Sequence, residues 1–257
     1  MIPLERMDAA ACRSLAGVAF DIDDTVTRGG RLEAAAFGAM YELAESGLRL
    51  VAVTGRPLGW IDVVVHHWPV DVGVGENGAG WVWRDGAATR EGYFESEARR
   101  RTYPELFDRV RRHVASELPH VRTAGDQRAR RCDLAFDVGE TVKLPSAEID
   151  VLVGIIESEG ARSAVSSVHA HAIPGDWDKA RGLQRAVRET LGQELDRDRW
   201  LFVGDSSNDA AAFEYFPLSV GVSNVRDHLS RLPTPPRYVT AADRGQGFAE
   251  LARHVLS

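Results

Sequence analysis

The sequence predicts an α/β fold in which a doubly wound, Rossmann-like parallel sheet forms the core and a smaller α+β domain is inserted into it. Three observations support this. Short apolar runs that end in polar or glycine-rich residues alternate with helical segments in the first 80 residues. The same alternation resumes near residue 178. Between these parts the pattern changes to a hairpin, a long charged helix and short strands, which is typical of an inserted domain.

The first part of the core is predicted from three apolar strands. Residues 15–22, 48–57 and 70–80 are nearly continuous apolar runs, as expected for strands buried in a parallel sheet. Residues 32–44 and 60–67 have helical composition, and Gly47 ends the first of these helices.

The inserted domain is expected to begin near Gly86 and to end near Ala172. Residues 1–85 and 173–257 would then form the core, and residues 86–172 the insertion. The insertion opens with a hairpin that turns at Asp85-Gly86. A helix at 95–118, a strand at 132–139, a helix at 146–159 and a strand at 161–173 are predicted to follow. After it come a helix at 178–191, strands at 200–205, 218–222 and 237–240, and further helices.

Composition narrows the class of protein. The chain has 257 residues, of which 44% are hydrophobic and 27% charged, which is typical of a globular protein. Its net charge of −7 argues against nonspecific binding to nucleic acid or to an anionic membrane. No apolar run approaches the ~18 residues of a membrane span, and no signal-peptide pattern is present. With two distant cysteines, Cys12 and Cys132, reduced thiols in the cytoplasm are expected. The sequence does not indicate an oligomeric state.

Polar side chains follow the predicted strands at the edge where parallel strands end. Asp21 and Asp23 follow the first strand, Thr54 follows the second, and Asp205 follows the strand at 200–205. Lys179 begins a helix at the same edge. Ligands of open α/β sheets bind outside the carboxyl ends of the strands. The clustered acids would repel one another unless a cation held them, and carboxylate oxygens suit Mg²⁺.

Four segments resemble, in order, the four motifs of the haloacid dehalogenase superfamily phosphatases. They are DIDDT (21–25), VTGR (53–56), DWDKARGL (176–183) and GDSSND (204–209). GENGA (75–79), with the insertion close behind it, resembles the branch with a large cap after the third core strand. That branch includes the Cof-type, sucrose-phosphate, mannosyl-3-phosphoglycerate and trehalose-phosphate phosphatases. The resemblance covers the core and is weak in the insertion, which we call the cap from here on.

The resemblance implies roles for the polar residues. Asp21 would be the nucleophile that forms an aspartyl phosphate, and Asp23 the general acid and base. Thr54 would hydrogen-bond the phosphoryl group, and Lys179 would neutralise charge. Mg²⁺ would be bound by Asp21, the main-chain carbonyl of Asp23 and Asp205, with Asn208 and Asp209 supporting the site.

Several residues of these motifs have two interpretations. Asp24 replaces the glycine of the commonest pattern and is either a loop acid that caps backbone amides or a metal contact. Asn208 either shapes the metal loop or caps the next helix. Arg56, with Gly55 beside it, either reaches phosphate or pairs with an acid.

The cap offers fewer candidates. Arg130 and Arg131 lie in the basic segment RARRCD and are either cations for an anionic substrate or part of a solvated loop. His169 and His171 alternate along one strand and therefore share a face. Because no third metal ligand is evident, substrate contact is the interpretation retained for His171.

The sequence thus favours a Mg²⁺-dependent phosphomonoester hydrolase that acts through an aspartyl phosphate on a small phosphorylated metabolite, with a sugar phosphate expected. One alternative is a sugar phosphomutase similar to the phosphomannomutases, which use the same kind of site. Another is a non-catalytic sugar-phosphate-binding protein. Its expected signature is the loss of catalytic residues, whereas Asp21, Asp23, Lys179 and Asp205 are all present.

Overall fold

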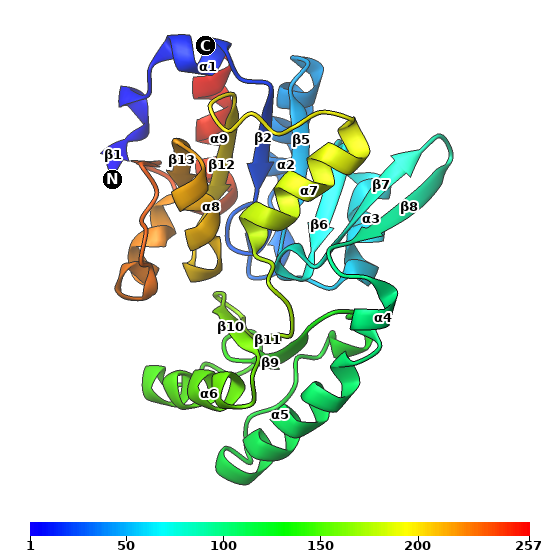
Figure 1. Cartoon of the computed structure of the whole chain (residues 1–257). Helices are drawn as coiled ribbons and strands as arrows, with labels where there is room; N and C mark the ends of the chain where they lie inside the picture. The colour runs from blue at the N-terminus through cyan, green and yellow to red at the C-terminus, as the bar shows by residue number, and fades with distance from the viewer.

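The structure, a computed structural model, describes residues 1–257. Figure 1 shows two parts: a large sheet flanked by helices, and a smaller group of helices and strands beyond the carboxyl end of β2 (Gly17–Phe20). No helix is long and apolar enough to cross a bilayer.

The core sheet confirms the predicted α/β class. It has nine strands in the order β1-β14-β13-β12-β2-β5-β6-β7-β8. All pairs from β1 to β6 are parallel, and the last two pairs are antiparallel. Besides β2, the strands are β1 (Ile2–Pro3), β5 (Arg49–Val53), β6 (Val72–Gly75), β7 (Gly80–Asp85), β8 (Ala88–Tyr93), β12 (Trp200–Gly204), β13 (Leu218–Gly221) and β14 (Tyr238–Val239).

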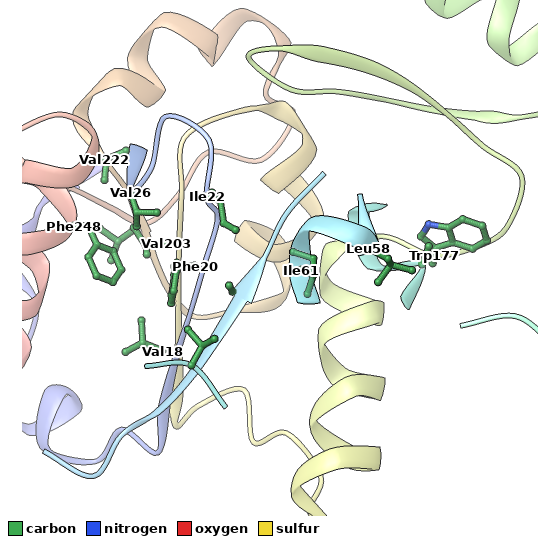
Figure 2. Packing of buried hydrophobic residues seen from close by; sticks show 14 of the residues in the cluster. Val18, Phe20, Ile22, Val26, Leu58, Ile61, Trp177, Val203, Val222 and Phe248 are labelled. Carbon is green, nitrogen blue, oxygen red and sulfur yellow. The ribbon is translucent and has the colours of Figure 1, made fainter. Parts of the chain in front are cut away.

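Helices cover both faces of this sheet, so its central strands are apolar on both sides. Val18 and Phe20 point to the face covered by α9, where the rings of Phe20 and Phe248 lie 5.1 Å apart (Figure 2). Ala19 points to the opposite face and packs in the cluster that includes Leu183 of α7. The core helices are α1 (Ala9–Arg13), α2 (Ala34–Glu45), α3 (Leu58–His67), α7 (Lys179–Leu191), α8 (Ala210–Tyr215) and α9 (Arg244–Val255).

The hairpin at Asp85-Gly86 corrects one predicted boundary. Its turn lies where predicted, and Gly86 has a φ of 64°, which favours glycine. Its second strand, β8, pairs along its whole length with β7 and so extends the core sheet. Gly92 of β8 packs directly on the indole of buried Trp81, where a side chain at residue 92 would clash. The limit at residue 86 is therefore wrong by one strand, and we place the start of the cap after Tyr93.

The cap contains a three-stranded sheet in the order β10-β11-β9, with antiparallel pairing throughout. The predicted helix at 95–118 is divided at residues 101 and 102, because Pro104 has no N–H with which to continue the first helix and instead lies in the first turn of the second. The predicted strand at 161–173 is a hairpin. The cap elements are α4 (Glu97–Arg100), α5 (Tyr103–Glu117), β9 (Leu134–Asp137), α6 (Ser146–Ser158), β10 (Arg162–Val165) and β11 (His169–Ile173).

Candidate active site

A buried lysine joins two of the predicted acids. Asp21 is the first residue after β2, and its N–H continues the sheet by donating to the Val203 carbonyl. Lys179, at the start of α7, donates from Nζ to Asp21 Oδ1 at 2.6 Å and to Asp209 Oδ1 at 2.7 Å. All three side chains are buried. Burial alone would lower the pKa of Lys179, but the carboxylates of Asp209 and Asp21 raise it above its ordinary value.

The acidic cluster has more negative charge than one lysine offsets. Carboxylate oxygens of Asp21, Asp205 and Asp209 lie within 4.8 Å of one another. Burial, together with the neighbouring carboxylates, raises the pKa of Asp21 to about 7 and that of Asp205 well above its usual range. Lys179 alone does not offset the charge of three buried acids. A divalent ion bound among them would favour their charged forms, so the cluster fits a divalent-cation site. Asp209 lies in this cluster and contacts Lys179, which is compatible with the supporting role expected from the sequence.

The loop after β12 holds Asp209 rigidly. Its Oδ2 accepts hydrogen bonds from the N–H groups of Asp205 (2.9 Å) and Ser206 (3.1 Å). Gly204 permits this approach, because a Cβ at residue 204 would clash with the Asp209 carboxylate. Asn208 donates to Asn77 Oδ1 at 3.0 Å and accepts from Ser206 Oγ at 2.9 Å, so it joins this loop to the segment after β6.

Asn224 is a site residue that the sequence analysis missed. Its Nδ2 donates to Asp205 Oδ2 (3.1 Å) and to the Asp24 carbonyl (3.0 Å). It lies three residues beyond the apolar strand β13, so a search of the whole segment after each strand could have found it. The Asp24 side chain pairs with Arg244 at 2.8 Å, which favours its role as a loop acid.

Several hydrogen-bond donors next to Asp21 have no protein acceptor. They are the N–H groups of Ile22, Asp23 and Gly55. Thr54 Oγ1 accepts from the Arg56 N–H at 3.0 Å, and its hydroxyl hydrogen has no protein acceptor. Free donors at the ends of the neighbouring strands β2 and β5 would suit an anionic group beside Asp21.

Arg56 pairs with acids rather than standing free. It donates to both oxygens of Asp23, at 2.8 Å each, and it also binds Glu140 (2.8 Å) and Asp126 (3.3 Å) of the cap. Arg56 therefore connects the predicted general acid to the cap. Glu140 and Asp126 could not be predicted as partners of Arg56, because their proximity to it arises only from the tertiary fold.

Arg130 and Arg131, the two candidate arginines of the cap, are also paired with acidic side chains. Arg130 is buried, pairs with Asp126 and Asp133 at 3.0 Å each, and donates to the Gly55 carbonyl at 2.8 Å. Arg131 is exposed and pairs with Glu91 on β8. Neither of the two sequence interpretations describes Arg130, which is a buried structural cation at the border of the site.

Glu76 connects the cap to the core. Its buried carboxylate accepts hydrogen bonds from the N–H of Leu58 (3.0 Å) in the core and from the N–H groups of residues 131–133 in the cap. Burial and the nearby Asp133 raise the pKa of Glu76 to about 7.

Glu76→Ala should lower the free energy of unfolding by roughly 3 kcal/mol or more, since buried donors without acceptors each cost about 1–3 kcal/mol. Denaturant unfolding measures this, with Glu97→Ala on exposed helix α4 as control. A loss below about 0.5 kcal/mol would mean that Glu76 does not hold the two parts together.

Comparison with solved structures shows that the fold is a known one. No protein-family model matches the chain, and no curated protein matches its sequence. A protein of Thermoplasma acidophilum (0175) is 19% identical with a TM-score of 0.72, covering 94% of this chain and 98% of the other. A putative HAD/COF-like hydrolase from Plasmodium vivax is 16% identical with a TM-score of 0.69, covering 97% and 99%.

The sucrose-phosphatase of Synechocystis, solved with sucrose and phosphate, is also similar. It is 16% identical with a TM-score of 0.66, and the match covers 94% of this chain and 98% of that chain. The chain therefore has the fold of the haloacid dehalogenase-like hydrolases of the Cof type, as its motifs predicted.

Proposed function

We propose that the protein is a Mg²⁺-dependent phosphomonoester hydrolase that acts through an aspartyl phosphate at Asp21 on a small phosphorylated metabolite. The observation that supports this most directly is the buried arrangement of Asp21, Lys179 and two further acids beside unpaired N–H donors. The likeness to a sucrose-phosphatase fold supports a sugar phosphate as the substrate class.

In the first step, an oxygen of the Asp21 carboxylate attacks phosphorus, and the bond between phosphorus and the ester oxygen breaks. Thr54, the free N–H groups and Lys179 stabilise the charge on the transferring group. Asp23 gives a proton to the departing alkoxide. Each Asp23 oxygen uses one lone pair to accept from Arg56, so a second lone pair can carry the proton that is transferred.

In the second step, Asp23 removes a proton from water, which attacks the same phosphorus and releases phosphate and free Asp21. Splitting the reaction in two lets one carboxylate serve as acid and then as base. Asp21, Asp205 and the main-chain carbonyl of Asp23 would hold the divalent cation, with Asp209 orienting Lys179 and Asn224 fixing the Asp205 carboxylate. When bound, that cation would neutralise charge on the phosphoryl oxygens.

Hydrolysis of p-nitrophenyl phosphate should require a divalent cation. We expect the released p-nitrophenol to fall to background in excess EDTA and to return on addition of Mg²⁺. Asp205→Asn should weaken the binding of Mg²⁺, seen as a higher Mg²⁺ midpoint. Full activity in EDTA would rule out the proposed cation site.

The stability of the metal-free protein should depend on pH through the acidic cluster. Folding raises the pKa of Asp21 from 3.8 to about 7, so the folded state binds more protons between these values. This contribution to stability is therefore present at low pH and lost as pH rises through about 7. Mg²⁺ should restore it, raising Tm more at pH 8 than at pH 5, as measured by calorimetry. An equal rise at both pH values would contradict the assignment.

A further inference from the structure

Two buried polar atoms at the border between the core and the cap have no hydrogen-bond partner. They are Nε2 of His171, on β11, and Nδ2 of Asn77, two residues after the end of β6. Both residues lie against Gly55: a Cβ built there would be 3.1 Å from His171 Nε2 and 3.3 Å from Asn77 Oδ1. Unpaired buried polar groups are rare and costly, so two of them beside a free Gly55 N–H point to a ligand.

Asp133 determines which His171 nitrogen carries the hydrogen. Nδ1 of His171 lies 2.8 Å from Asp133 Oδ2, and Arg130 lies 3.0 Å from the same carboxylate. Burial would raise the pKa of Asp133, but Arg130 and His171 lower it. An ionised carboxylate only accepts, so Nδ1 carries the hydrogen and donates it to Asp133.

The other nitrogen of His171 is therefore an acceptor. Burial lowers the pKa of His171 to about 4 despite the neighbouring Asp133. The ring is neutral near pH 7, and Nε2 has a lone pair without a proton. It needs a hydrogen-bond donor, which no protein group supplies.

His169, two residues earlier on the same face of β11, differs from His171. Its Nε2 lies 2.9 Å from Glu140 and its Nδ1 lies 3.4 Å from Arg130 Nη2, so both nitrogens have partners. Of the two histidines on β11, only His171, which packs on Gly55, has a ring nitrogen without a partner.

A bound phosphate dianion cannot satisfy His171, because its oxygens only accept. It suits the free N–H of Gly55 and the amide of Asn77 instead. A hydroxyl group on the alcohol part of the substrate supplies the missing donor. We infer that His171 is a specificity-determining residue that accepts a hydrogen bond from a substrate hydroxyl beside the phosphate ester. The preferred substrates are then monophosphates of polyols or sugars with a free neighbouring hydroxyl. This inference rests on the proposed phosphatase function.

The test compares esters that differ in their hydroxyl groups. The pairs are glycerol 3-phosphate with 1-propyl phosphate, and glucose 1-phosphate with 2-deoxyglucose 1-phosphate. Because a buried acceptor without a donor is costly, wild-type kcat/KM should favour the hydroxylated member of at least one pair roughly 10- to 100-fold. His171→Leu should lower kcat/KM for that member to the level of its partner, while the partner changes less than about threefold. His120→Leu, at an exposed cap histidine, should keep the preference.

The outcomes separate the two proposals. If wild type with Mg²⁺ hydrolyses no ester, the phosphatase proposal fails. If it hydrolyses both members of each pair equally, or if His171→Leu keeps the preference, only the role of His171 fails. If circular dichroism shows that His171→Leu does not fold, ¹⁵N NMR of the His171 imidazole in the Asp21→Asn protein provides the test instead. Glycerol 3-phosphate or glucose 1-phosphate should shift the Nε2 signal and leave Nδ1 protonated, whereas 1-propyl phosphate should not; no shift with either hydroxylated ester overturns the inference.

Discussion

Asp21→Asn should lower kcat by about 10⁵-fold or more, since the loss of a covalent nucleophile removes the whole two-step route. The carboxamide retains the size of the side chain and keeps an oxygen toward Lys179, so the fold should persist. Asp23→Asn should lose less, roughly 10²–10⁴-fold, which is typical of general acid–base catalysis.

Steady-state kinetics with p-nitrophenyl phosphate and with a sugar phosphate measure both variants. Asp21→Ala serves as a second variant, because the carboxamide of the Asp21→Asn protein can deamidate slowly and regenerate the nucleophile. If Asp21→Ala retained more than about 1% of wild-type kcat, the proposed nucleophile would be wrong.

Lys179→Met should lower both activity and stability. It leaves Asp21 and Asp209 without their shared cation in a fully buried setting. Breaking a buried ion pair by removing one partner typically costs about 3–5 kcal/mol. Because the folded pKa values of Asp21 and Asp205 are raised, the loss should be larger at pH 8 than at pH 5, where protonation relieves the repulsion.

A double-mutant cycle in EDTA gives this prediction a control. The variant with both Asp21→Asn and Lys179→Met should be more stable at pH 8 than Lys179→Met alone, since it has one buried carboxylate fewer. Arg188→Met, at an exposed position of the same helix, should change stability by about 1 kcal/mol or less. A Lys179→Met protein as stable as wild type at pH 8 would contradict the buried network.

The core could be predicted from the sequence because its signals are local. Apolar runs such as Val18–Phe20 identify buried strands, and a polar residue directly after each run marks the edge of the sheet. That reasoning predicted Asp21, Thr54 and Asp205 at one edge of the sheet, and the structure brings Asp21 and Asp205 into one cluster. Asn224 lies three residues beyond β13 and escaped a rule that considers only the first polar residue after a strand.

The cap was less predictable because its important contacts are between residues far apart in the chain. The Asp85-Gly86 turn predicts a hairpin but does not specify the sheet that β8 joins. Similarly, the sequence around Arg130 shows a positive charge without its partners. Only the fold reveals that the Arg130 guanidinium binds Asp126, Asp133 and the Gly55 carbonyl.

The most direct test of the account is to identify the residue that becomes phosphorylated. Enzyme quenched in acid during turnover of a sugar phosphate, then reduced with borohydride, converts an aspartyl phosphate into homoserine. Because Asp23→Asn should slow hydrolysis of the intermediate, that variant is measured beside wild type, and Asp21→Asn serves as the blank. Peptide mass spectrometry should find homoserine at position 21 and at no other aspartate. Homoserine at another aspartate, or phosphate attached to a histidine or serine, would contradict the central claim that Asp21 attacks phosphorus.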